Sequence, residues 1–203
     1  MNERVSPQSG KKILSEDYIA TERHGSARQE YHNGQVIPKS GGNRWHNLIA
    51  TSMAIAIGTR LQGNKAEIYV NGMRVQLGSR MICYPDVVVV GGEPIFADSN
   101  ADILMNPTVI MEVFSKVTNP NEKSRKLEAY LALESIKECL QIKADDMRVE
   151  HYSKQNPKQW LYRIYNERDD VISLDSLNIK ISVAEIYSQV KLRNAEISSS
   201  AVN

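Results

Sequence analysis

The spacing of hydrophobic positions changes along the chain, and each spacing predicts a different kind of element. From His46 to Leu61 the apolar side chains recur every three or four residues, which predicts the buried face of a helix. Val87–Val90 and Val109–Met111 are apolar at every position, as in central strands that are covered on both faces. We therefore predict an α/β (mixed α+β) fold, with a central mixed sheet flanked by helices on both faces.

Turn and cap residues divide the remaining chain. Asn33-Gly34 lies within residues 29–37 and predicts a hairpin. A turn or bulge at Gly72 accounts for the change of alternation between residues 66–70 and 73–77. The other expected elements are a short helix capped by Ser15, a helix from Asn119 to about Glu134 that buries Leu127, Tyr130 and Leu131, an antiparallel C-terminal meander of strands near 139–142, 149–152 and 160–165, and a last helix over 183–190.

The size and charge of the chain restrict its class. The 203 residues, with 25 Lys and Arg against 24 Asp and Glu, suit one domain, which we place at residues 13–192 between tails at 1–12 and 193–203. The net charge of +1 excludes a polybasic nucleic-acid coat and an acidic disordered tail, but it leaves room for a local basic patch.

Several absences from the sequence favour a soluble, cytoplasmic protein. The two cysteines, Cys83 and Cys139, are too few for a disulfide scaffold or a Cys-rich zinc site. Uninterrupted apolar runs such as Val87–Val90 are far too short to span a membrane, and the polar N-terminus shows no secretory signal.

Two acidic residues border the most apolar strands. Asp86 precedes Val87–Val90, and Glu112 is expected to end the strand that begins at Val109. A carboxylate at the edge of a doubly covered strand is costly unless a cation or donor compensates it. If the two strands are neighbours, both carboxylates can converge on a hard cation such as Mg²⁺, and a nearby lysine would complete a phosphodiester-cleaving site.

Each of these residues also has an ordinary structural explanation. A Pro-Asp pair often forms a turn or caps a strand, and Glu112 can be a compensated charge at a strand end. His46, at a helix start, can contact a phosphate, hold a carboxylate or cap the helix. The aromatic residues Trp160, Tyr162 and Tyr165 fit a core and sheet surface better than a platform for base stacking.

An ordered series of short motifs resembles the Uma-type (Uma-two) endonuclease family of the PD-(D/E)XK restriction-endonuclease-like superfamily. The similarity extends over about residues 13–190. It is carried by the stretches Gln29–Val36, Gly41-Gly42, His46-Asn47, Met73–Val75, Tyr84–Val90, Glu112–Ser115, Lys126–Tyr130, Val149–Tyr152 and Ala184–Tyr187.

The resemblance implies a metal-dependent active site with assigned roles. Asp86 and Glu112 correspond to the two metal-binding carboxylates, and Glu30 to an additional acid from the N-terminal region. The superfamily lysine usually lies two residues after the second acid, where this chain has Phe114. In the Uma-type pattern it comes from the next helix, which points to Lys126.

Two alternatives to this lysine assignment stay open. Lys126 can instead form an i,i+4 pair with Glu122, a solvated contact of about 0.3–0.5 kcal/mol. Lys116, four residues after Glu112, is another candidate for the active-site lysine. The chain also departs from the family at Ser115–Thr118 and at Glu122, where an aspartate is usual.

The resulting functional prediction is a Mg²⁺-dependent endonuclease that hydrolyses DNA, with Mn²⁺ as a possible substitute for Mg²⁺. The competing hypotheses are a catalytically silent relative that binds nucleic acid or a protein, and a structural protein whose acids are strand-end caps. Cutting both strands of a duplex calls for two active sites, so we also expect a homodimer, with apolar area from Tyr152, Trp160 and Tyr162 at its interface.

Overall fold

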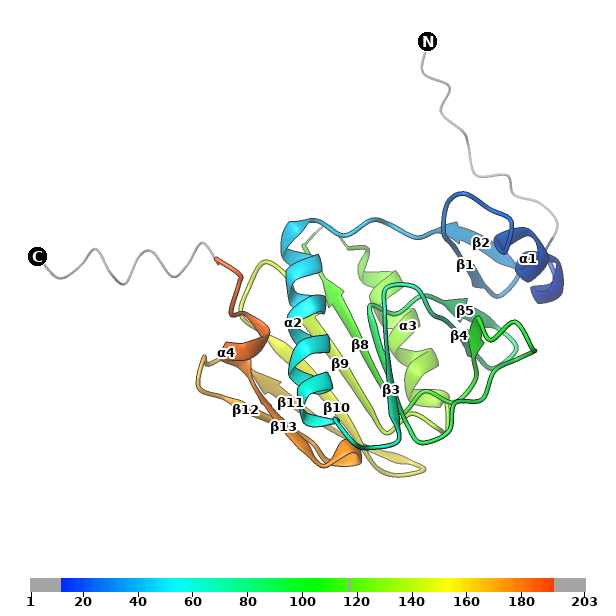
Figure 1. The fold of residues 1–203 in the computed structure, drawn as a ribbon. Helices are drawn as coiled ribbons and strands as arrows, with labels where there is room; N and C mark the ends of the chain where they lie inside the picture. The colour runs from blue at the N-terminus through cyan, green and yellow to red at the C-terminus, as the bar shows by residue number, and fades with distance from the viewer. Residues whose placement is uncertain (1–11, 117, 192–203) are drawn as a thin grey trace, which may run out of the picture.

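A mixed six-stranded sheet forms the centre of the structure, a computed structural model that describes residues 12–116 and 118–191 (Figure 1). The strand order is β11-β10-β9-β8-β6-β3; β8 and β9 run parallel, and the other neighbours run antiparallel. The strands are β3 (Ala66–Val70), β6 (Val87–Gly91), β8 (Val109–Phe114), β9 (Glu138–Lys143), β10 (Val149–Asn156) and β11 (Gln159–Tyr165). This arrangement confirms the predicted mixed sheet and its C-terminal meander.

A second sheet of five short strands lies beside the first, with the order β2-β1-β5-β4-β7. Its β1–β2 hairpin turns at Asn33 (φ 51°) and Gly34 (φ 91°), as the sequence predicted. Its strands are β1 (Gln29–His32), β2 (Gln35–Pro38), β4 (Arg74–Leu77), β5 (Met81–Cys83) and β7 (Ile103–Leu104).

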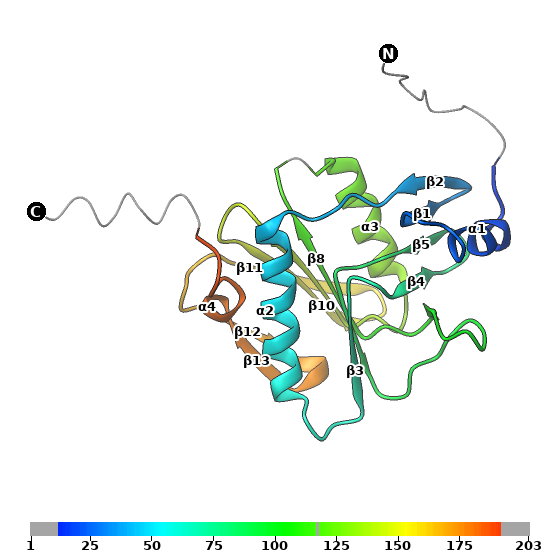
Figure 2. The same cartoon turned by 45° about the horizontal axis from the view of Figure 1, so that its top comes forward.

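The two faces of the six-stranded sheet pack against different helices (Figure 2). Helix α2 (Arg44–Arg60), the short α4 (Val183–Ile186) and the hairpin of β12 (Val171–Leu174) and β13 (Ile179–Ser182) share one core with Val87, Val89 and Met111. Helix α3 (Pro120–Ala132) and the five-stranded sheet share the other core with Val88, Val90 and Ile110. The alternate residues of each central strand are thus all buried, which explains their continuous apolar sequence.

The chain passes from one sheet to the other between β3 and β4. The predicted turn is present, but the residue in the left-handed conformation is Asn71 (φ 55°) rather than Gly72. The strands on either side of the turn pair with different partners, β3 with β6 and β4 with β5. The change of alternation therefore marks a crossing between sheets.

Several predicted boundaries need correction. Ser15 is already the first residue of α1 (Ser15–Glu22), and the preceding Leu14 provides no side-chain cap. Helix α3 begins at Pro120 with Asn119 as its cap, as predicted, but it ends at Ala132. Its buried residues are Lys126 and Tyr130, whereas Leu127 and Leu131 are only partly buried. Helix α4 ends at Ile186, where Tyr187 leaves the helical conformation.

Two other expectations concern the ends of the chain and the membrane. Apart from Lys12, the predicted tails at 1–12 and 193–203 lie outside the described residues. Within the part of the chain that the structure describes, none of the helices has the length and apolar character needed to cross a membrane.

Candidate active site

Asp86 and Glu112 lie on neighbouring strands and on the same face of the sheet. Strands β6 and β8 pair with Val87 opposite Met111, and continuing this register by one residue sets Asp86 opposite Glu112. Both carboxylates belong to the face that α3 covers. Glu112 does not end its strand as predicted, since β8 continues to Phe114. Adjacency on one face is thus confirmed, whereas a shared cation stays a prediction.

Lys126 reaches these acids from α3. Its ammonium Nζ lies 3.0 Å from Glu112 Oε1 and 2.9 Å from Glu30 Oε1, and the residue is only 3% exposed. One turn further along α3, the hydroxyl of Tyr130 donates a hydrogen bond to the same Glu112 oxygen. The structure thus places Lys126 between two carboxylates rather than in a surface pair with Glu122.

Lys116 is exposed and lies outside the cluster that Glu30, Asp86, Glu112 and Lys126 form. Its backbone N–H donates to Asp145 Oδ2 across 3.1 Å in the loop that follows β8. Of the two lysines weighed from the sequence, the structure brings Lys126 to the acids.

Glu30 joins the cluster from the five-stranded sheet. Its Oε1 accepts a hydrogen bond from the backbone N–H of Tyr84 at 3.0 Å, in addition to the contact with Lys126. Its Oε2 lies 3.2 Å from His32 Nε2. Both oxygens of Glu30 are therefore already engaged by donors. Sequence reasoning missed His32, two residues along β1 from Glu30, although that spacing puts both side chains on one face of the strand.

Asp86 is held by groups from three different segments. Its Oδ2 accepts the backbone N–H of Val113 at 2.8 Å, while its Oδ1 lies 3.0 Å from His46 Nε2 and 3.4 Å from Lys39 Nζ. The His46 ring contacts a carboxylate, and Asn43 rather than His46 caps α2 by accepting from the backbone N–H of His46. A phosphate contact of His46 stays a prediction. Lys39 was not singled out from the sequence, because only the tertiary fold brings it to Asp86.

Burial and neighbouring donors and charges act in opposite directions on the pKa values of Glu30 and Asp86. Burial would raise the pKa of Glu30, but His32 and Lys126 outweigh it and lower that pKa to about 2. Burial is likewise outweighed at Asp86 by His46 and Lys39, which lower its pKa to about 2.

Glu112 and Lys126 differ from these two acids. Burial raises the pKa of Glu112, with Lys126 acting against it. Burial lowers the pKa of Lys126, but Glu112 and Glu30 outweigh it and hold that pKa well above the usual lysine value. Lys126 is therefore a fixed positive charge at neutral pH, and Glu112 is the acid of the cluster that most readily takes up a proton.

A small cavity of about 350 Å³ opens onto Asp86. Apart from Asp86, its polar lining is basic or neutral and includes Arg28, Lys39, His46 and Asn47. Such a lining favours an anion over a cation or an apolar ligand. A phosphate group in this cavity would lie beside the carboxylate that the sequence marks as a metal ligand.

The donor set of the cluster fits a hard cation. Mg²⁺ prefers oxygen ligands and is usually held by one or two carboxylates together with waters and substrate phosphates, so Asp86 and Glu112 would suffice. Among the described residues, no group of three or more His, Cys, Asp or Glu side chains is arranged as a complete metal cage. Glu30 could serve as a third carboxylate only by giving up one of its present donors.

Gly42 controls the position of the His46 ring, which yields a first prediction. A Cβ atom at Gly42 would stand 2.5 Å from His46 Cδ2, whereas a Cβ at the neighbouring Gly41 would meet nothing within 4 Å. We expect Gly42→Ala to displace the ring from Asp86 and to lower the free energy of unfolding by about 1.5–3 kcal/mol, the contribution of a hydrogen bond to a charged group. Urea denaturation measures the change in stability, and the NMR chemical shifts of the His46 ring report its displacement.

Gly41→Ala is the matched control and should leave both measurements unchanged. Equal behaviour of the two variants would show that the contact between His46 and Asp86 does not depend on Gly42.

Gln141 is a further buried polar residue, next to Glu112 in the six-stranded sheet. It lies opposite Glu112 in β8 and opposite Glu150 in β10, and it is 2% exposed. Neither its Oε1 nor its Nε2 has a hydrogen-bond partner within the described part of the chain. The sequence carried a signal for this residue, because Gln141 interrupts the apolar run from Cys139 to Ile142.

Replacing Gln141 by methionine should stabilise the fold. The substitution keeps the shape of the side chain and removes two buried, unpaired polar groups, which cost about 1–3 kcal/mol. We expect the free energy of unfolding to rise by about that amount in urea denaturation. Gln141→Glu should instead destabilise the protein at neutral pH, because it adds an acid beside Glu112 and Glu150. A destabilised Gln141→Met would mean that the amide is satisfied in solution.

Comparison with known proteins places this geometry in a family. The sequence model of Uma2, described as "Putative restriction endonuclease", matches residues 15–184. An uncharacterized protein of Synechocystis sp. is 30% identical over 150 residues, which are 73% of this chain and 85% of the relative. A second from the same organism is 24% identical over 177 residues, or 87% of this chain and 92% of the relative.

A solved structure shows the same fold. The crystal structure of a "putative nuclease belonging to DUF820" from Anabaena variabilis superimposes with a TM-score of 0.72 and covers 87% of this chain and 98% of its own. The two sequences are 19% identical. The match supports a restriction-endonuclease-like fold, as predicted.

Proposed function

Because this chain belongs to the Uma2 family of restriction-endonuclease-like proteins, we propose that it is a Mg²⁺-dependent endonuclease that hydrolyses the phosphodiester bonds of DNA. The observation that carries the proposal is the buried lysine between Glu30 and Glu112, next to Asp86 and its anion-accepting cavity. Buried charges of this kind are costly to maintain and cluster at functional sites. We further propose that residues 13–192 act as one domain.

The proposed roles follow from the contacts of each residue. Asp86 and Glu112 would hold Mg²⁺, with Mn²⁺ as a substitute and Glu30 as a candidate third carboxylate. The bound ion would supply a Lewis acid for the phosphate and lower the pKa of the attacking water. Glu30 and Glu112 keep Lys126 charged and in place, and Tyr130 fixes the Glu112 oxygen that Lys126 contacts.

Lys126 acts in this proposal through its charge. Glu112 and Glu30 raise the pKa of Lys126, so its side chain carries a positive charge when it meets the substrate. A fixed ammonium beside the reacting phosphate stabilises the negative charge that develops during phosphodiester cleavage. Lys39 and His46 would help to hold the incoming phosphate, since both line the cavity at Asp86.

Incubation with plasmid and short oligonucleotides tests the proposal directly. We expect cleavage of DNA with Mg²⁺ or Mn²⁺ and none with a chelator, and RNA oligonucleotides test the preference for DNA. DNA binding without turnover in either metal would show the alternative of a catalytically silent nuclease fold. A protein that binds neither metal nor nucleic acid would contradict the nuclease proposal and leave a silent relative that binds a protein, or a structural protein.

We also propose a cytoplasmic homodimer. Tyr162 is 45% exposed on the edge strand β11, its ring lies 4.9 Å from that of Tyr152, and Ile164 is exposed on the same strand. Both cysteines are free and buried, which suits a reducing compartment. A monomeric mass by light scattering at micromolar concentration would contradict the dimer.

A further inference from the structure

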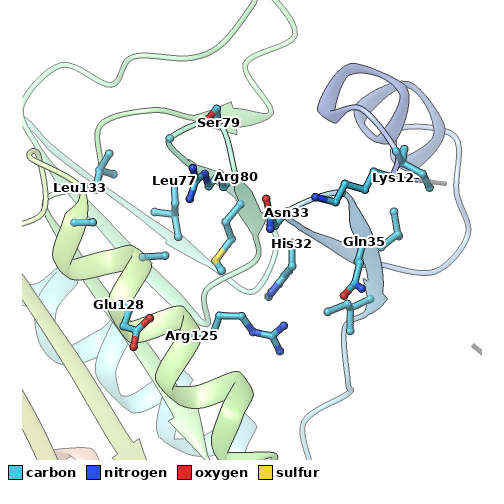
Figure 3. A pocket seen from close by; sticks show the side chains of 18 residues that line it. Lys12, His32, Asn33, Gln35, Leu77, Ser79, Arg80, Arg125, Glu128 and Leu133 are labelled. Carbon is cyan, nitrogen blue, oxygen red and sulfur yellow. The ribbon is translucent and has the colours of Figure 1, made fainter. Parts of the chain in front are cut away.

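A groove of about 1530 Å³ runs between the β1–β2 hairpin, the turn that joins β4 to β5, and α3 (Figure 3). It is separate from the cavity at Asp86, and the two share no lining residue. The roles proposed above for the acids and Lys126 leave this groove unexplained.

Positive charge predominates along the groove. Lys12, Arg80 and Arg125 line it, against a single acid, Glu128. All four side chains are exposed, and neither arginine forms a salt bridge with a described carboxylate. In a chain whose net charge is only +1, this is a local concentration of unpaired cations.

His32 connects the groove to the catalytic cluster. It lines the groove, is 3% exposed, and places its Nε2 3.2 Å from Glu30 Oε2. Its other ring nitrogen, Nδ1, is buried and has no hydrogen-bond partner within residues 12–116 and 118–191. A buried unpaired nitrogen at the wall of a groove is a point where a bound ligand can supply the missing partner.

Two consecutive residues of α3 face the acids and the groove, respectively. Lys126 contacts Glu30 and Glu112, while the preceding Arg125 faces the groove (Figure 3). A ligand in the groove would therefore be separated from Glu30 only by the His32 side chain, which lines the groove and contacts Glu30.

We propose that this groove binds the phosphodiester backbone of a DNA strand whose reacting phosphate lies at Asp86 and Glu112. The proposal rests on the nuclease function proposed above and adds the surface along which the substrate lies. Arg80 and Arg125 would contact phosphates, for which the guanidinium group is well suited, and Lys12 would add a further charge. Contacts of this kind position a strand without reading its sequence.

The test is DNA binding in the presence of a chelator, which removes cleavage from the measurement. Fluorescence anisotropy with labelled duplex and single-stranded oligonucleotides compares the wild type with the double variant Arg80→Gln/Arg125→Gln over a range of salt concentrations. Arg163→Gln/Arg168→Gln is the matched control, because both arginines are exposed and lie outside the groove. Thermal unfolding checks that all three proteins are folded.

We expect the groove variant to bind about three- to tenfold more weakly for each arginine lost at low salt. The slope of log affinity against log salt should become shallower by about 0.7–0.9 for each phosphate contact removed. The control variant should match the wild type in both quantities. Comparison of the two oligonucleotides shows which form of DNA the groove accepts.

Two outcomes would overturn the proposal. The first is equal DNA affinity in the wild type and the groove variant. The second is a change in oligomeric state without a change in DNA affinity, which would make the groove an interface between copies. If the wild type cleaves DNA and the groove variant binds DNA as tightly as the wild type, the groove proposal fails and the nuclease proposal stands. If DNA binding depends on the groove but no cleavage occurs, the nuclease proposal fails and the groove proposal stands.

Discussion

Replacing Asp86 by asparagine should reduce DNA cleavage by more than about 10³-fold and abolish tight Mg²⁺ binding. Asparagine keeps an oxygen that can accept the N–H of Val113, so the fold should persist. It removes the negative charge that a hard cation requires and that Lys39 and His46 now compensate. Plasmid cleavage measures the first effect, and calorimetric titration with Mg²⁺ measures the second.

Asp98→Asn is the control for this variant. Asp98 is an exposed aspartate that pairs with Arg23 away from the cluster, so its loss should change neither measurement. Wild-type cleavage and Mg²⁺ affinity in Asp86→Asn would remove Asp86 from the proposed site.

Replacing Lys126 by alanine should lower the cleavage rate by about 10²–10⁴-fold, the range for a positioned acid–base or electrostatic group. Mg²⁺ affinity should stay nearly intact or rise slightly, because a nearby positive charge is lost. Without the ammonium, the buried carboxylates of Glu30 and Glu112 lose their common partner. The metal-free variant should therefore be less stable by about 3–5 kcal/mol, and Mg²⁺ should restore part of that loss.

Two further variants test the alternatives for this lysine. Glu122→Gln and Lys116→Ala should both cleave at nearly the wild-type rate, because neither side chain lies in the cluster. If Lys126→Ala cleaves normally and Lys116→Ala is inactive, the lysine assignment is wrong and the acids alone stand. If both lysine variants are active, neither lysine contributes to cleavage, and the proposed nuclease mechanism lacks its charged residue.

Local sequence patterns predicted the hairpin turn, the start of a helix and a buried strand, because neighbouring residues determine each of them. Asn33 and Gly34 take the positive φ angles that a tight hairpin requires, and Asn119-Pro120 begins α3. The four consecutive valines of β6 predicted a strand that is buried on both faces. The division into two sheets was not predicted, because pairing partners such as β4 with β5 depend on contacts that no local pattern records.

The candidate site divides in the same way. Asp86 and Glu112 could be found because each places a charge beside an apolar run. Lys126 carries no such signal, since α3 is largely polar, and its assignment came from the family resemblance. Lys39 escaped notice because only the tertiary fold brings it to Asp86. His32 was missed although its spacing from Glu30 along β1 places both side chains on one face.

The position of Glu30 has a consequence for how the protein opens. Glu30 contacts Lys126 on α3 and the N–H of Tyr84, which lies between β5 and β6, so one carboxylate joins the hairpin to the central sheet. Separation of the hairpin would expose this amide and break the contact with Lys126 in a single event. The exchange rate of the Tyr84 amide proton with solvent therefore reports how often the cluster comes apart, without any substrate or metal in the sample.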